Sequence, residues 1–318
     1  MNQQFDVRPA ADHDIDQLSA FLNACTLAHQ GIARSSPEDI RARIHRNGAE
    51  PVRDSFVVRV DERIVGFAHI WRDDPDEIKF FARSHPDERG RGVGGLLVQL
   101  CEQRASQLPA TRLTTTTWAA DASAPSLLVT YGYRPVRYFM KMEIGTADVP
   151  KEPSWPLQVD RSDLASYPDA TTTLYRAWSE AFAGHWGQSD ESEAEFWNER
   201  RTSKIKAAFP FDPTLWLVAL RDGSVIGFCL CEMGTGESAL IGRISEVGVV
   251  PAHRGNGLGY ALLVAGLNEL RSRGARSMVL DVDAENETSA VRVYEKAGMS
   301  SHPAFTIWEK SNRVSDAP

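Results

Sequence analysis

The chain lacks the features that mark disulfide-stabilised or metal-binding proteins. Its 318 residues include only four cysteines, and no two of these form a Cys-x-x-Cys pair. Neither a disulfide framework nor a zinc site is therefore indicated. Cys229 and Cys231 lie two residues apart on an apparent strand, so we expect both to pack in the core on one face. The simplest prediction is a reducing compartment and no bound metal.

Long apolar runs are also missing. No stretch is long enough to cross a bilayer, and the N-terminus has neither the basic nor the apolar region of a secretory signal. We therefore expect a cytoplasmic protein with no membrane partner. The formal net charge is −8, which disfavours general binding to nucleic acid because phosphate neutralisation needs a basic surface.

What the sequence does contain is a strand, a basic glycine-rich turn and an amphipathic helix in succession, over residues 246–263. Gly255, Gly257 and Gly259 stand at alternate positions of this turn, so the backbone can come close to a ligand. The helix that follows directs free N–H groups and a partial positive charge at the same place. This arrangement predicts an anion site, and a phosphate-bearing cofactor is its natural occupant.

The same loop occurs earlier in the chain, at residues 85–97. Here Arg89, Gly92 and Gly94 repeat the pattern that begins at Arg254, about 165 residues later, a spacing far longer than the period of about 20–50 residues expected of a solenoid. The loop repeat therefore indicates the duplication of a whole domain.

Two further landmarks recur at nearly the same offset. A strand-turn-strand segment at 57–67 has its counterpart at 218–228, and Gly132 has its counterpart in Gly298. Between the copies lies a segment with three prolines, which disfavours helix and central strand alike. We therefore predict two domains, 1–148 and 149–318, in agreement with a length prior of about 150 residues per domain.

The C-terminal loop resembles the acyl-CoA-binding motif of the GCN5-related N-acetyltransferase (GNAT) superfamily, Gln/Arg-x-x-Gly-x-Gly/Ala, filled here by Arg254, Gly257 and Gly259. Residues 280–286 and 290–299 resemble the next strand and helix of that family. The duplication resembles its tandem, mycothiol synthase type. The resemblance implies an α/β (α+β) fold of two tandem GNAT-like domains, each a mixed, mostly antiparallel central sheet flanked by helices.

The function that the resemblance implies is acetyl-CoA-dependent N-acetylation. The acetyl group would pass directly to a primary amine of a small molecule in a ternary complex, with acetyl-CoA as co-substrate and no metal. The expected cofactor residues are Val247, Gly248 and Val249 beside the pantetheine arm, Arg254, Gly255, Asn256, Gly257, Leu258 and Gly259 at the diphosphate, and Asn286 steadying the arm. Tyr294 matches the tyrosine that protonates the leaving thiolate, and its alternative is a buried helix aromatic.

The general base is less clearly marked. Many relatives carry a glutamate eight residues before the proline that ends the cofactor strand, but Arg243 stands there. The nearest carboxylate is Glu246, which would take the proton directly or through a water, or would be an ordinary solvent-facing residue. His185 and Trp186 follow the first helix of the C-terminal copy, where the family has its acceptor pocket. A histidine base and an aromatic wall suit that place, and a locally packed helix end is the alternative.

A comparison of the two copies predicts which one is catalytic. Aligning Gly132 with Gly298 puts Leu128 at the position of Tyr294 and Ala120 at that of Asn286. The N-terminal domain is therefore expected to be degenerate and the C-terminal domain catalytic. The N-terminal copy still has a second possible cofactor loop, formed by Arg89, Gly90, Gly92 and Gly94.

Three alternatives stay open at this point. Residues 90–95 satisfy the dinucleotide pattern Gly-x-Gly-x-x-Gly, but Tyr260 breaks that spacing in the second copy, and both loops follow several strands instead of the first. A non-catalytic CoA-binding protein is a second alternative. A third is mycothiol synthase-like acetylation of a cysteinyl pseudodisaccharide. The oligomeric state is not predicted.

Overall fold

The computed structural model describes residues 5–30, 35–45, 50–156, 158–167, 169–186, 191–202, 209–235, 238–285 and 290–312. Within these ranges, none of the helices is long and apolar enough to cross a bilayer. The chain forms two compact units. Unit 1 comprises residues 1–138 and 304–318, and unit 2 comprises residues 139–303.

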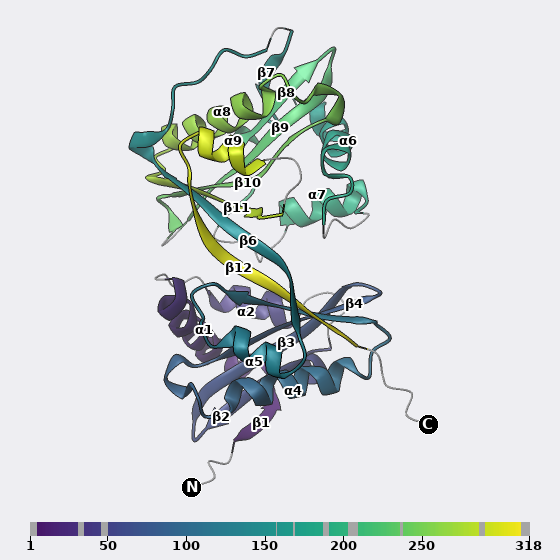
Figure 1. The fold of residues 1–318 in the computed structure, drawn as a ribbon, viewed down its shortest axis with the longest axis vertical. Coiled ribbons are helices and arrows are strands. Elements are labelled where there is room, and N and C mark those ends of the chain that lie inside the picture. The colour runs from purple at the N-terminus through teal and green to yellow at the C-terminus, as the bar shows by residue number, and fades with distance from the viewer. Residues whose placement is uncertain are drawn as a thin grey trace. The chain divides into compact units, whose positions relative to one another are not determined.

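Unit 1 contains a sheet in the order β1-β2-β3-β4-β5-β12 (Figure 1). Its strands are antiparallel except for β4 and β5, which pair in parallel. The elements from the N-terminal part of the chain are β1 (Asp6–Pro9), α1 (Ile15–Gln30), α2 (Pro37–Ile44), α3 (Pro51–Asp54), β2 (Ser55–Val60), β3 (Arg63–Asp74), β4 (Glu77–Ser84), α4 (Val93–Ala105), β5 (Arg112–Trp118) and α5 (Ala124–Thr130).

Unit 2 repeats this architecture with the sheet order β6-β11-β10-β9-β8-β7. Only β10 and β11 pair in parallel there. Its elements are β6 (Arg134–Gly145), β7 (Asp160–Asp163), α6 (Ala170–Phe182), α7 (Glu193–Thr202), β8 (Trp216–Arg221), β9 (Ser224–Met233), β10 (Ile241–Val249), α8 (Leu258–Ser272), β11 (Ser277–Asp283) and α9 (Ala290–Lys296). The last strand of the chain, β12 (Ser300–Ser311), follows α9.

The last strand of each sequence repeat pairs with a strand of the unit that is built mainly from the other repeat. β6 begins in unit 1, but its second half pairs with β11 of unit 2, where Phe139 lies opposite Asp283. β12 begins in unit 2, but from Phe305 onward it pairs with β5 of unit 1. The compact units therefore do not follow the order of the sequence, whereas the boundary at residues 148/149 refers to the sequence repeat and stays a prediction.

Alternation along the strands explains how helices cover both faces of each sheet. In β9, Cys229 and Cys231 pack against α8, whereas Phe228 and Leu230 pack against α6. α8 and α9 therefore cover one face of unit 2, and α6 and α7 cover the other (Figure 1). Both cysteines are fully buried with their sulfur atoms 3.6 Å apart, which confirms the core packing expected for them.

The ends of the helices α8 and α9 agree with the signals in the sequence. α8 stops at Ser272 and is followed by Gly274 with φ of 95°, and α9 stops at Lys296 before Gly298 with φ of 88°. Glycine adopts this left-handed conformation without the steric cost that a side chain would bring. Gly132 closes α5 in the same way, so this landmark of the duplication recurs in the structure.

Candidate active site

The glycine-rich loop of unit 2 joins β10 to α8. Gly255 and Gly257 adopt φ of 84° and 86°, and Gly257 is the N-cap of α8. The N–H groups of Gly255, Gly257 and Gly259 have no hydrogen-bond acceptor among the described residues. The N–H of Leu258, between two of them, donates to Oδ1 of Asn256 at 3.3 Å. Unpaired N–H groups clustered at a helix N-terminus are suited to binding an anion.

Arg254 braces this loop. Its Nε donates to the carbonyl of Val249 at 3.0 Å, and its Nη2 donates to the carbonyl of Ala181 at 2.8 Å. The first bond ties the loop to the end of β10, and the second ties it to the last turn of α6. The guanidinium thus holds the loop in shape and leaves the backbone N–H groups exposed to a ligand.

Beyond Arg243, β10 loses its neighbour on one side. β10 and β11 pair in parallel only from Ile241↔Ser277 to Arg243↔Val279. β10 then continues to Val249 along β9 alone, while β11 continues along β6. A bulge between Ile244 and Glu246 accompanies this divergence, and bulges bend the strand that contains them. The result is an open backbone edge next to the glycine-rich loop.

Glu246 lies on β10 at the start of this opening. Its Oε1 accepts a hydrogen bond of 2.8 Å from Nη2 of Arg200 on α7. Its Oε2 is buried and has no hydrogen-bond partner among the described residues. Buried carboxylate oxygens are normally satisfied, so an orphan oxygen in this place is a candidate proton acceptor.

Arg243 faces a second carboxylate. It lies opposite Glu232 in the ladder between β10 and β9, and its Nη1 is 3.7 Å from Oε2 of Glu232. Glu232 is only 4% exposed. Position 243, where the family resemblance predicts a glutamate, therefore carries a cation that is paired with a glutamate on the neighbouring strand.

Tyr294 projects from α9 into the core cluster on the α8 face and is 7% exposed. Burial raises the pKa of the phenol well above its usual value, so Tyr294 is neutral at physiological pH. Its counterpart in unit 1 is Leu128. The N–H of Met299 donates to the carbonyl of Tyr294, as the N–H of Tyr133 does to the carbonyl of Leu128.

The remaining predicted residues of unit 2 lie at the end of α6 and beyond β11. The His185 ring contacts Phe182 edge-on with centroids 5.2 Å apart, and the Trp186 side chain is 39% exposed. Because Arg254 bonds to Ala181, this helix end is tied to the glycine-rich loop. Asn286 lies outside the described residues.

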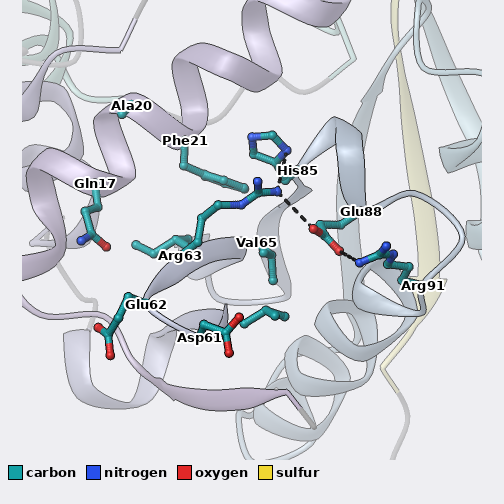
Figure 2. A pocket seen from close by; sticks show the side chains of 12 residues that line it. Gln17, Ala20, Phe21, Asp61, Glu62, Arg63, Val65, His85, Glu88 and Arg91 are labelled. Carbon is teal, nitrogen blue, oxygen red and sulfur yellow. Dashed lines mark hydrogen bonds and ion pairs between the residues drawn. The ribbon is translucent and has the colours of Figure 1, made fainter. Parts of the chain in front are cut away.

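The corresponding loop of unit 1 has the same backbone conformation, with Gly90 and Gly92 at φ of 76° and 89°. Its side chains differ. Glu88, which is 8% exposed, accepts from Arg63 at 3.1 Å and from Arg91 at 3.0 Å. Figure 2 shows these ion pairs at the edge of a cleft of about 730 Å³ between α1, the β2–β3 turn and this loop.

The N-terminal loop also keeps its first arginine engaged. Arg89 contacts Nε2 of His29 through Nη2 at 3.1 Å. Arg91, the other arginine of this loop, forms an ion pair with Glu88. In unit 2 the positions of Glu88 and Arg91 are occupied by His253 and Asn256, so unit 2 has no such ion pair.

Sequence reasoning missed Arg200 and Glu232. Arg200 lies 46 residues before its partner Glu246, and no spacing rule connects an exposed-looking helix arginine to a distant strand. Glu232 offers a weak signal, because a charged residue in the otherwise apolar strand Ser224–Met233 needs a partner once it is buried.

Comparison with known families identifies the class of protein. The sequence profile of the acetyltransferase (GNAT) family matches residues 19–133 and 171–299, once in each repeat. The chain therefore belongs to the GNAT family of acetyltransferases and is an acyltransferase.

Proteins named mycothiol acetyltransferase are similar along most of the chain. That of Thermobispora bispora is 31% identical over 252 residues, covering 78% of both chains. That of Thermomonospora curvata is 30% identical over 308 residues, covering 94% of both chains.

Solved structures agree on the tandem fold. A GCN5-related N-acetyltransferase from Sphaerobacter thermophilus has a TM-score of 0.77 at 28% identity, covering 97% of this chain and 96% of its own. A tandem GNAT protein from the clavulanic acid biosynthesis pathway has a TM-score of 0.76 at 18% identity, covering 98% of this chain and 100% of its own. At that identity the second likeness shows the fold alone.

Proposed function

We propose that unit 2 transfers the acetyl group of acetyl-CoA directly to a primary amine of a small molecule within a ternary complex. The observation that carries the proposal is the opening between β10 and β11 beyond Arg243, which lies beside an anion-binding loop. An extended ligand with amide groups at one end and a diphosphate at the other fits such a site.

Each part of acetyl-CoA has a complementary part of the chain. The free backbone edge of β10 suits the pantetheine amides, which would lie along it as an added strand. The unpaired N–H groups of the loop suit the diphosphate. The residues assigned to the cofactor are Val247, Gly248, Val249, Arg254, Gly255, Asn256, Gly257, Leu258, Gly259 and Asn286.

Glu246 is proposed as the general base. Arg200 fixes one carboxylate oxygen and leaves Oε2 available for the proton of the amine, directly or through a water. The lone pair of the neutral amine attacks the thioester carbon, Glu246 takes the proton that the attacking nitrogen loses as the amide forms, and the carbon–sulfur bond breaks to release the thiolate. Holding both reactants side by side supplies much of the rate enhancement, because the reaction becomes effectively unimolecular.

Tyr294 is proposed as the general acid that protonates the thiolate. A thiol has a pKa of about 8.5 and a phenol of about 10, so this proton transfer is only mildly unfavourable for an unperturbed pair. Burial raises the pKa of the phenol, which makes it a weaker acid, but the same apolar surroundings also disfavour the thiolate that receives the proton.

His185 and Trp186 are proposed to line the acceptor pocket at the end of α6. An acceptor there would meet an imidazole and a partly exposed indole, a surface suited to an amine carried on an apolar or cationic body. The relatives named mycothiol acetyltransferase favour the cysteinyl pseudodisaccharide as a second candidate acceptor. Arg243, in place of a glutamate, weighs against it.

Turnover assays with Tyr294→Phe test the proposal. CoA release is followed with a thiol reagent across a panel of small amines that includes the cysteinyl pseudodisaccharide. We expect kcat to fall by about 10²-fold or more, the usual contribution of a general acid, with little change in the KM for acetyl-CoA. Tyr260→Phe is the matched control, because Tyr260 is a half-buried tyrosine on α8 with no assigned role.

Tight acetyl-CoA binding without turnover on the whole panel would contradict the proposal and favour a non-catalytic CoA-binding protein. Equal turnover by the wild-type protein and Tyr294→Phe would remove Tyr294 from the mechanism.

A further inference from the structure

The two repeats carry different residues at a strand position beside the opening between β10 and β11, where the cofactor is proposed to bind. In unit 2, Gly248 of β10 pairs with Phe228 of β9. In unit 1, Arg83 of β4 pairs with Phe67 of β3, the counterpart of Phe228. The ladder registers thus make Arg83 the structural equivalent of Gly248.

Unit 2 needs glycine at this position. A Cβ at Gly248 would lie 2.5 Å from the ring of Phe228, so no side chain extends from that point of β10. At Gly248, therefore, no side chain of β10 covers the opening.

In unit 1 the same opening is crossed by a side chain. β4 and β5 pair in parallel only as far as Phe80↔Thr115 and then diverge. Nη1 of Arg83 donates to the carbonyl of Ala82 on β4 at 2.8 Å and lies 3.5 Å from the carbonyl of Thr116 on β5. One guanidinium thus reaches the backbone of both strands where the gap begins.

Aromatic rings hold this guanidinium in place. Its carbon lies 4.3 Å from the ring centroid of Phe81 and 4.2 Å from that of Trp118, one ring from each diverging strand. Cation–π contacts of this kind are stronger where the cation is shielded from water. Burial lowers the pKa of Arg83 to about 10, so the side chain stays charged at neutral pH.

We propose that Arg83 closes the N-terminal opening to the acyl-pantetheine arm, so that each chain holds one acetyl-CoA, in unit 2. The inference rests on the proposed function of unit 2. Its chemical basis is competition for one backbone group. The carbonyl of Ala82, the counterpart of Val247, already accepts a hydrogen bond from Arg83. It is therefore not available to a pantetheine amide that would lie along β4 as an added strand. The loop of unit 1 keeps its fold, but the arm has no open edge to follow.

The first test counts binding sites by titration calorimetry with acetyl-CoA, using the wild-type protein and two loop variants. Gly259→Asp puts a carboxylate at the unit 2 loop, where its Cβ would meet Val249 at an ordinary 3.6 Å. An acidic residue in the first helical turn is favourable for the helix but repels a diphosphate. Gly94→Asp makes the same change in unit 1, against the end of the Leu127 side chain at 3.0 Å.

We expect one site in the wild-type protein, none in Gly259→Asp and one in Gly94→Asp. Two wild-type sites with amine-dependent turnover intact would overturn this inference and leave the proposed function standing. Loss of the single site in Gly94→Asp instead of Gly259→Asp would also overturn it. No binding to the wild-type protein would overturn the proposed function and the inference together.

A second test removes the obstruction. Arg83→Ala is expected to expose the N-terminal edge and raise the number of acetyl-CoA sites from one to two, with the new site abolished by adding Gly94→Asp. Arg63→Ala is the matched control, because it removes an arginine of unit 1 that lies outside the opening. A folded Arg83→Ala variant that still binds one acetyl-CoA would refute the role of Arg83, and the wild-type titrations keep the inference testable if that variant does not fold.

Discussion

The exchange of last strands predicts that a substitution in one repeat destabilises the unit built mainly from the other. Trp308 lies in the C-terminal repeat, yet it is 6% exposed in the core of unit 1, and its Nε1 donates to Oγ1 of Thr117 at 2.9 Å. Truncating a buried tryptophan to alanine costs about 3–5 kcal/mol. At about 2–4 °C per kcal/mol for a unit of this size, Trp308→Ala should lower the Tm of unit 1 by about 6–20 °C.

The mirror-image substitution is Met142→Ala. Met142 lies in the N-terminal repeat but is fully buried in the core of unit 2, and its truncation should cost unit 2 about 2–5 kcal/mol. Val129→Ala is the control, since Val129 is 60% exposed on α5 and such surface changes stay within about 0.5 kcal/mol.

Calorimetry measures the size of each loss, and hydrogen exchange with mass spectrometry locates it. Trp308→Ala should reduce protection in peptides of α4 and β3, and Met142→Ala in peptides of α8 and β9. If each substitution instead lowered protection only within its own repeat, the strand assignment and the reasoning built on it would be wrong.

Three other outcomes follow from particular contacts. Burial raises the pKa of Asp14, but hydrogen bonds from Arg8 and the backbone outweigh it and hold that pKa below its usual value. The ionised carboxylate therefore stabilises unit 1 at pH values above the pKa that Asp14 has in the unfolded chain, and this stabilisation is lost as the pH falls through its lower pKa in the folded protein. Asp14→Asn should lower the free energy of unfolding by about 1.5–3 kcal/mol at neutral pH. It should also weaken the fall of that free energy with decreasing pH, as measured by urea unfolding from pH 2 to 7. Arg200→Met should leave the Glu246 carboxylate without its cation and lower kcat in the CoA-release assay with little change in the KM for acetyl-CoA; an unchanged kcat would contradict the role given to that pair. Gly257→Ala forces a side chain into the left-handed region that the loop already adopts without ligand, at a cost of about 1–2 kcal/mol, so urea unfolding should show unit 2 destabilised by that amount; an unchanged free energy of unfolding would exclude this strain.

The sequence predicts local structure and the duplication well because these depend on short-range signals. The loop from Arg254 to Gly259, the glycines that end α8 and α9, and the buried pair of cysteines all follow from spacing and turn chemistry. The mixed, mostly antiparallel sheet is predicted from the resemblance to the GNAT superfamily and not from these local signals.

The long-range features could not be predicted in this way. Nothing in the strand pattern of residues 134–145 says that half of β6 pairs outside its own repeat, because alternation fixes which face a residue occupies and not which strand lies beside it. The ion pair of Glu246 with Arg200 could not be predicted for a similar reason, because the two residues are distant in the sequence. An alignment of the two copies does show Arg83 opposite Gly248, but its proposed role depends on the direction of the guanidinium, which the sequence does not give.

The exchanged strands bear on whether either repeat can stand alone. A protein made from the C-terminal repeat alone would lack β6 beside β11, and the backbone groups from residue 277 to residue 283 would lose the partners that β6 now provides. The N-terminal repeat is thus a structural part of unit 2. Deleting it should destabilise unit 2 whether or not that repeat binds a cofactor itself.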